Sequence, residues 1–463
     1  MNQTQAQKAL ELSLDQCLYL ASNKSSEIRR IDVEHEIAKL RWLNFKVDLK
    51  PKWNINGTIP DFSRTFAPTI QPDGTTAFNA VLLSNSNLIS EIGQNIPSTG
   101  GELFVQSRLR RFDDFNKDNT VYNGNPVIIG LRQPLFGNNS LRWEKKVQIA
   151  TLRESHKLYN TRVEELNLDV VNQYFEVWQL QIKRLILDRS VMTRRKVYLT
   201  VRDKYLSGKV LELELIQADI EQINAALQLQ EADLMLKENT VKLSRLIGDS
   251  SGLARYKLAT PEIDTTVSID EDVALYQIME NSGKAATWER QMVELQRGVA
   301  QAKRNSGMNI EMTATFGLAN SSTSLEQLFQ DPDDQQTFRL SFRLPVWQWN
   351  KHKRAVKISA LNKEIALLNI EEERQVFEQQ VRAEIRKFKQ QIMRIRAVNL
   401  KRQLSTKAHN IALVSYSNGK IGSFELNQAW ENLQNAHNDY IRTNQDYWKH
   451  YFQLRAFGLN IDQ

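Results

Sequence analysis

The sequence YLSGKVLELELIQA (residues 205–218) occurs a second time, in altered form, as YSNGKIGSFELNQA (residues 416–429). The two copies share Tyr, Gly-Lys, Glu-Leu and Gln-Ala at one constant offset, 416 − 205 = 211. The same offset relates RQPL at 132–135 to RLPV at 343–346. Self-similarity at a fixed spacing indicates an internal duplication.

Two structural repeats follow from this match, residues 1–248 and 268–463. Residues 249–267 contain Gly and Pro and are interpreted as the linker. SLD at 13–15 aligns with SID at 268–270 at an offset of 255, so the first repeat carries about 255 − 211 = 44 additional residues. The polar region 61–125 is rich in Ser, Thr, Asn, Gly and Pro, and the insertion is placed there.

Each repeat is predicted to contain one very long helix. Phe136 to Lys204 has no Pro and is rich in good helix formers. Apolar residues recur there at spacings of three and four, which is typical of coiled coils. Two such seams are present: Leu168, Val171, Phe175, Trp178, Ile182 and Leu185, and Val163, Leu166, Val170, Tyr174 and Val177. About 69 residues would span roughly 100 Å, and Trp347 to Ser415 repeats the pattern through Val381, Ile385 and Phe388.

Shorter helices are predicted to return beside the long ones, at 13–49, 211–247, 269–306 and 422–458. The long helix and its returning partner meet in tips at 205–211 and 416–423. Each tip contains a Gly-Lys turn, and Gly suits a helix end at which the chain reverses.

Alternating polarity predicts strands in both repeats. In 308–318 and 338–344, apolar and polar residues alternate, which is the period of a strand with one apolar face. The second repeat is expected to hold strands at about 308–346, and the first at about 51–134. Leu88 to Ile96 and Leu103 to Arg111, joined by STGG at 98–101, predict a further hairpin. Strands of this length with one apolar face suit a transmembrane barrel.

Composition narrows the class of protein. No run of 18 apolar residues occurs, so a membrane span would have to be built from strands. Four strands per chain cannot close a membrane barrel, and three chains would give 12. The insertion at 61–125 leaves this count open, because it can be an extracellular loop, extra strands or a cap. The net charge is +7, but no nucleic-acid reader motif accompanies it, so no nucleic-acid partner is expected. Cys17, the single cysteine, is expected in the core. The polar residues 1–7 predict a mature chain whose signal peptide has been removed.

These features resemble the TolC-like outer-membrane factors of efflux pumps and type I secretion systems. The resemblance rests on the duplicated helix–strand–strand–helix plan, on the junctions QPLF at 133–136 and LPVW at 344–347, on the paired tips, and on the run from Ala429 to Gly458. It implies a mostly α-helical protomer with a β-barrel portion, which forms a homotrimer with an α-helical barrel in the periplasm and a 12-stranded β-barrel in outer-membrane lipid. It also implies a periplasmic adaptor as partner and, through the adaptor, an inner-membrane transporter.

The resemblance further implies that the adaptor docks on the tips. The residues concerned are Gly208, Lys209, Val210, Leu211, Gly419, Lys420, Ile421, Gly422 and Ser423. The alternative is that the glycines only permit the turn. A basic stripe, formed by Arg382, Arg386, Lys389 and Arg396, is interpreted as facing the lumen or an acidic neighbour, and its alternative is a solvated outer face.

The function expected is a passive exit duct, with no enzymatic activity. None of the six His forms a recognisable metal-binding pair, and no nucleophile motif or phosphate-binding loop is present, so no catalytic residue, metal or cofactor is predicted. Two alternatives remain: a coiled-coil scaffold without a pore, and the same channel dedicated to polypeptide secretion.

Overall fold

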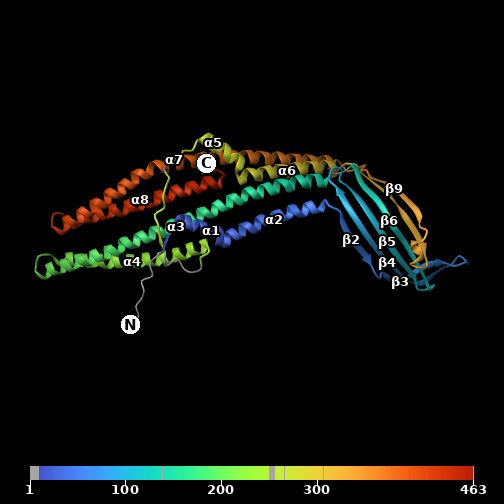
Figure 1. The fold of residues 1–463 in the computed structure, drawn as a ribbon, viewed down its shortest axis with the longest axis horizontal. Helices are drawn as coiled ribbons and strands as arrows, with labels where there is room; N and C mark the ends of the chain where they lie inside the picture. Colours follow the sequence, from blue (N-terminus) through green and yellow to red (C-terminus); the bar gives the residue numbers. More distant parts are fainter. Residues whose placement is uncertain (1–9, 137–138, 250–255, 265, 306, 462–463) are drawn as a thin grey trace. The chain divides into compact units, whose positions relative to one another are not determined.

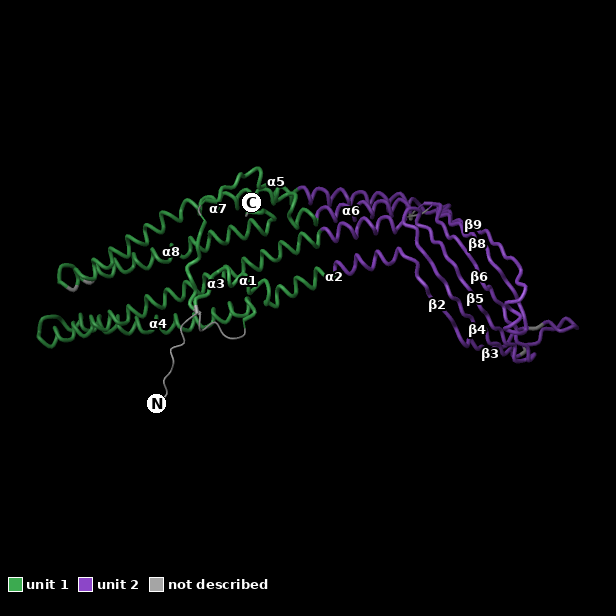
Figure 2. Tube along the Cα trace, viewed as in Figure 1, with its two compact units in different colours: residues 1–37, 154–287, 372–463 green, residues 38–153, 288–371 purple. Residues whose placement is uncertain are grey.

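A computed structural model describes residues 10–136, 139–249, 256–264, 266–305 and 307–461. The chain forms two compact units, shown in Figure 2. Unit 1 comprises residues 1–37, 154–287 and 372–463, and unit 2 comprises residues 38–153 and 288–371. The prediction of a removed signal concerns residues 1–7, which lie outside the described residues, as do 250–255 and 265 of the linker.

The two long helices are present and equal in length. Helix α3 (Ser140–Leu206) and helix α7 (Lys351–Ser417) each contain 67 residues. Their starts and their ends are both related by the offset found in the sequence, 351 − 140 = 211 and 417 − 206 = 211. The duplication therefore holds to the residue over both helices, each of which extends about 100 Å at 1.5 Å per residue.

The returning helices differ from the prediction in one respect. The stretches 211–247 and 422–458 form single helices, α4 (Glu212–Ile247) and α8 (Ser423–Ala456), as expected. The stretches 13–49 and 269–306 do not, because each is divided into a short and a longer helix: α1 (Leu14–Lys24) and α2 (Ser26–Asp48), and α5 (Glu271–Asn281) and α6 (Gly283–Asn305). None of the helices described combines the length and hydrophobicity that a membrane crossing needs.

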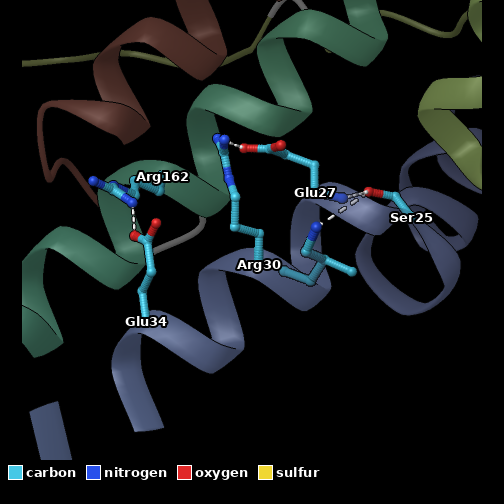
Figure 3. A network of polar contacts seen from close by, with 6 residues as sticks. Ser25, Glu27, Arg30, Glu34 and Arg162 are labelled. Atoms are coloured by element: carbon cyan, nitrogen blue, oxygen red, sulfur yellow. Dashed lines mark hydrogen bonds and ion pairs between the residues drawn. The ribbon is translucent and has the colours of Figure 1, made fainter. Parts of the chain in front are cut away.

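A buried serine makes each of these breaks, and Figure 3 shows the first one. The Ser25 amide still donates to the Ala21 carbonyl (3.3 Å), while the Ser25 hydroxyl accepts from the amides of Glu27 (3.0 Å) and Ile28 (3.2 Å). Ser282 repeats the arrangement, donating to Ile278 and accepting from Ala285. Each serine thus ends one helix and caps the next, which supplies partners for amides that a helix start leaves unpaired.

The positions of the two serines change the alignment of the repeats. Ser25 and Ser282 are 282 − 25 = 257 residues apart, and the ends of α2 and α6 give the same value, 305 − 48 = 257. The offset of 255 predicted from the SLD and SID triplets is therefore wrong by two. The helix caps that correspond are Ser13 and Asp270, and the first repeat carries 257 − 211 = 46 additional residues.

Both predicted seams of α3 lie in the core of unit 1. Val171, Phe175 and Trp178 are buried from the first seam, and Leu166, Val170, Tyr174 and Val177 from the second, although Leu185 is exposed. The Tyr174 hydroxyl lies 2.6 Å from the Ala259 carbonyl and 3.1 Å from the Leu12 carbonyl. It thereby ties α3 to a two-stranded parallel sheet of β1 (Leu10–Leu12) and β7 (Tyr256–Leu258). Cys17 is also fully buried, as predicted.

Unit 2 contains one antiparallel sheet (Figure 1). Its strands are β2 (Lys52–Thr58), β3 (Phe62–Ile70), β4 (Thr76–Ile96), β5 (Gly101–Asp114), β6 (Asn119–Phe136), β8 (Asn309–Ser322) and β9 (Asp333–Arg343). The order is β2-β4-β5-β6-β8-β9, and β3 continues the edge of β2 along the same partner, β4. A short 3₁₀ helix, η2 (Gln327–Phe329), lies between β8 and β9.

The number of strands in the sheet differs from the number predicted for each chain. The hairpin expected around residues 98–101 is present as β4 and β5. It lies within the sheet, between β2 and β6, so each chain supplies six neighbouring strand positions. The prediction of four strands per chain, which the insertion at 61–125 left open, is therefore corrected to six strand positions. The physical reason is that β4 and β5 pair with neighbours on both sides along most of their length and so occupy places in the sheet.

The serine breaks can be tested by removing the cap. Ser25→Ala and Ser282→Ala should each lower the free energy of unfolding by about 1 kcal/mol, because a helix start loses its side-chain acceptor. Thermal or denaturant unfolding followed by circular dichroism measures the change. Ser359→Ala, inside α7 and away from any helix end, is the matched control. Equal stability of all three variants would contradict the capping role.

Candidate functional site

The first tip is closed by a glycine in the left-handed conformation. Gly208 has φ +66°, and its amide donates to the Tyr205 carbonyl (2.9 Å). The next amide, of Lys209, donates to the Lys204 carbonyl (2.9 Å). This pair of hydrogen bonds is the Schellman motif that ends helices at glycine. Leu211 then starts α4 without a side-chain cap.

The second tip has the same geometry. Gly419 has φ +72°, its amide donates to the Tyr416 carbonyl (3.0 Å), and the Lys420 amide donates to the Ser415 carbonyl (2.9 Å). Gly422 precedes α8, and its amide donates to the Glu425 carboxylate (3.0 Å). A Cβ at Gly208 or Gly419 would meet nothing within 4 Å. The two glycines are therefore required by backbone conformation and not by a crowded neighbour.

Exposed apolar side chains lie beside both turns. Of the predicted docking residues, Gly208, Lys209, Leu211, Gly419, Lys420 and Gly422 are exposed, whereas Val210 and Ile421 are half-buried. Leu206 (75% exposed) and Phe424 (74%) flank the turns and were not predicted. Their signal in the sequence was an apolar residue beside a Gly-Lys turn, outside the coiled-coil seams. Docking at these residues stays a prediction.

Arg194 links the two helical hairpins of unit 1 close to their tips. Arg194 of α3 forms an ion pair with Glu221 of α4, and its other terminal nitrogen donates to Asn427 of α8 (2.7 Å). The Arg194 side chain is 22% exposed. Charge-assisted hydrogen bonds of partly buried arginine are stronger than those of neutral groups. Arg194 therefore fastens the hairpin of the first repeat to that of the second.

A crevice of about 570 Å³ lies beside this link. It is lined from α3, α7 and α8 and includes Arg194, Asn427, His409 and His437. Burial lowers the pKa of both histidines below the usual value, and the nearby charge of Arg402 adds to the effect at His437. The crevice therefore favours neutral imidazoles, which is consistent with a packing role for both rings.

The basic stripe is divided between two environments. Arg382 bonds Glu271 and Asp272 at the start of α5, each at 3.1 Å, while Arg386, Lys389 and Arg396 are exposed. Hydrogen bonds from two backbone amides lower the pKa of Asp270, and the charge of Lys389 contributes. The stripe thus passes the acidic start of α5 within the same chain. Whether its exposed members line a lumen stays a prediction.

The sheet of unit 2 has one apolar and exposed face. Directly paired residues share a face, and one row across the sheet runs through Trp53, Ile92, Val105, Ile129 and Phe316. All five are exposed, and Phe338 (70%) and Phe342 (75%) of β9 extend the apolar surface. The opposite face carries Asn54, Glu91 and Gln106 in the adjacent row. So large an exposed apolar face on a folded sheet indicates contact with lipid or with another chain.

No chemistry beyond this was found in the described part of the chain. None of its groups of His, Cys, Asp and Glu side chains could hold a metal ion. The polar clusters there, such as the α2–α3 contacts between Glu34 and Arg162 in Figure 3, join neighbouring helices. This part of the chain offers packed helices, two exposed tips and an exposed apolar sheet face.

Comparison with known proteins supports this interpretation. Residues 94–249 match the family model described as outer membrane efflux protein. Probable outer membrane lipoprotein SilC of Salmonella typhimurium is 23% identical over 209 residues, which cover 44% of this chain and 43% of SilC. The outer membrane channel CmeC of Campylobacter jejuni superimposes with a TM-score of 0.67 at 16% identity, over 97% of this chain and 87% of CmeC. The MtrE channel of Neisseria gonorrhoeae gives 0.65 at 15% identity, over 99% and 94%.

The fold is therefore that of TolC-like outer-membrane channels, and the resemblance predicted from the sequence is confirmed. The structural neighbours CmeC and MtrE are outer membrane channels, which is the class that the sequence predicts. The aligned part is less than half the length of SilC. Activity and partners are taken up below as proposals.

The link between the hairpins gives a testable prediction. Arg194→Met removes both charge-assisted bonds and should let the tips separate. Spin labels at Lys209 and Lys420 should then give a longer and broader distance distribution when measured by double electron–electron resonance.

Arg184→Met is the matched control, since Arg184 pairs with Asp233 inside the first hairpin alone. The same distribution in both variants would show that Arg194 does not hold the hairpins together.

Proposed function

We propose that the protein is the outer-membrane exit duct of an efflux or secretion system. Three copies join their sheets into one barrel in lipid, and their helices form a water-filled tunnel. The exposed apolar face of the sheet supports this proposal most directly, because an edge-to-edge assembly would present that face to lipid. A coiled-coil scaffold in water would leave the same face exposed to solvent at a large cost in free energy.

The partners follow from the same assembly. A periplasmic adaptor docks on the tips formed by residues 205–211 and 416–423 and connects the duct to an inner-membrane transporter. The exposed Leu206, Leu211 and Phe424 support docking of an apolar helical partner there. The duct is passive, and the choice of cargo, whether small molecules or polypeptide, lies with the transporter.

The channel is tested by isolating the protein from outer membranes. A heat-modifiable trimer that conducts ions in planar bilayers is expected, because only a closed barrel satisfies the strand backbone in lipid. Recovery as an elongated, water-soluble dimer without conductance would support the scaffold instead.

The role of the tip glycines is tested by comparing two substitutions. At Gly208 and Gly419, Ala should cost about 1 kcal/mol because φ is positive, whereas Asn tolerates this conformation better. If the adaptor docks on bare backbone, both variants should reduce adaptor binding by at least tenfold. If the glycines only permit the turn, Asn should bind like the wild type and Ala should bind less well. Affinity for the purified adaptor, with helicity as the folding control, separates the two.

A further inference from the structure

The hairpin β4–β5 is an integral part of the sheet by its backbone pairing. All of β2 pairs with residues 87–93 of β4, and all of β5 pairs with residues 83–96 of β4. On its other side, β5 pairs with β6 from Glu102 to Asp114, with one irregularity between Gln106 and Arg108. A wall of four strands would require β2 to pair directly with β6, which would break both of these ladders.

Side chains also fit β5 to β6. The ring of Phe104 lies where a side chain at Gly130 would be, since a Cβ there would meet the ring at 2.2 Å. Phe104 is buried, and the guanidinium of Arg132 lies 5.3 Å from its ring centre. Arg132 also forms an ion pair with Glu102 of β5. Aromatic–glycine pairing of this kind fixes the register of neighbouring strands.

Strand direction makes the two open edges of the sheet complementary. All neighbouring pairs in the order β2-β4-β5-β6-β8-β9 are antiparallel. Six is an even number, so β2 and β9 run in opposite directions and can pair as antiparallel strands between copies. Each edge strand has a described neighbour on one side only, β4 for β2 and β8 for β9.

The stagger of the strands matches a closed barrel. Lys52, the first residue of β2, is connected through directly paired residues (Gly93, Phe104, Gly130 and Thr315) to Thr337 of β9. Arg343, the last residue of β9, lies 343 − 337 = 6 residues beyond Thr337 along the same strand. With about 3.3 Å per residue and about 4.8 Å between strands, six residues over six strands tilt the strands by about 35°. Membrane barrels have tilts of about 35–45°.

We infer that three copies close a barrel of 3 × 6 = 18 strands, in which β2 of each copy pairs with β9 of the next. This inference rests on the proposed trimeric channel and adds the width of its membrane pore. Barrel diameter grows roughly linearly with strand number, so the pore is about one and a half times as wide as a 12-stranded one. The outer membrane would then hold a wide aqueous opening, as barrels of about 16–18 strands do.

Engineered cysteine pairs test the position of the hairpin. Asn54 and Glu91 are directly paired, so Asn54→Cys with Glu91→Cys should form a disulfide. Asn54 and Ile128 lie three strand spacings apart, about 14 Å, which exceeds the reach of a disulfide. A 12-stranded wall would bring β2 beside β6 and reverse this outcome. Thr313→Cys with Arg339→Cys, directly paired across β8 and β9, is the positive control in either arrangement.

The readout is the number of free thiols after oxidation and unfolding. Each double variant has three thiols, the third being Cys17. Burial raises the pKa of the Cys17 thiol to about 12, so it should stay reduced in the folded protein. The Asn54–Glu91 variant should fall from three thiols to one, and the Asn54–Ile128 variant should keep three. The opposite pattern would overturn the inference.

Electron cryo-microscopy of the unmodified trimer provides a second measurement that needs no substitution. Eighteen strands, with β2 beside β9 of the neighbouring copy, are expected. Twelve strands would overturn the inference while leaving the channel intact. Failure to recover any membrane trimer would instead refute the proposed function, although the thiol counts would still place the hairpin.

Discussion

Backbone hydrogen bonding in the sheet is the constraint on which the rest of the structure depends. A strand in lipid has no water to satisfy its amides and carbonyls, so every strand needs a neighbour on each side. Within the chain, β4, β5, β6 and β8 meet this requirement, and β2 and β9 do not. In the proposed assembly, the edges of β2 and β9 would find partners in neighbouring copies, and the apolar row from Trp53 to Phe316 would face lipid.

The helices are constrained by length, because the shorter helices must together cover the long helix beside them. A 67-residue helix needs partners along its whole length, and the chain supplies them as shorter helices of 11 and 23 residues followed by a longer one. Ser25 and Ser282 let the short helices change direction without leaving buried amides unpaired. Polar contacts such as Arg162–Glu34 then tie the returning helix to the long one. The same solution in both repeats, at one offset, argues that these breaks are part of the design inherited by both halves.

The tips are held by local backbone hydrogen bonds and by few buried side chains. The Schellman turns at Gly208 and Gly419 fix the local backbone, but few buried contacts surround them, since Leu206, Leu211 and Phe424 are exposed. Arg194 supplies a polar connection between the hairpins where the apolar seams have ended. Arg194, at 22% exposure, keeps its charge-assisted bonds partly shielded from water. In the proposed duct, this link would hold the tips of the two repeats together.

Much of this architecture was determined by the sequence alone. The offset of 211, the long helices, the glycine tips and the β4–β5 hairpin all follow from local signals: residue type, periodicity and turn chemistry act over a few residues and are visible in the chain. No Gly or Pro beside Ser25 marks the first break, whereas Gly283, directly after Ser282, is a local signal of the second. Only the tertiary structure decided that β4 and β5 stand between β2 and β6, that Arg382 meets the acidic start of α5, and that Arg194 joins the two hairpins. Each of these depends on which distant segments become neighbours, and pairing across tens or hundreds of residues leaves no periodic mark in the sequence of either partner.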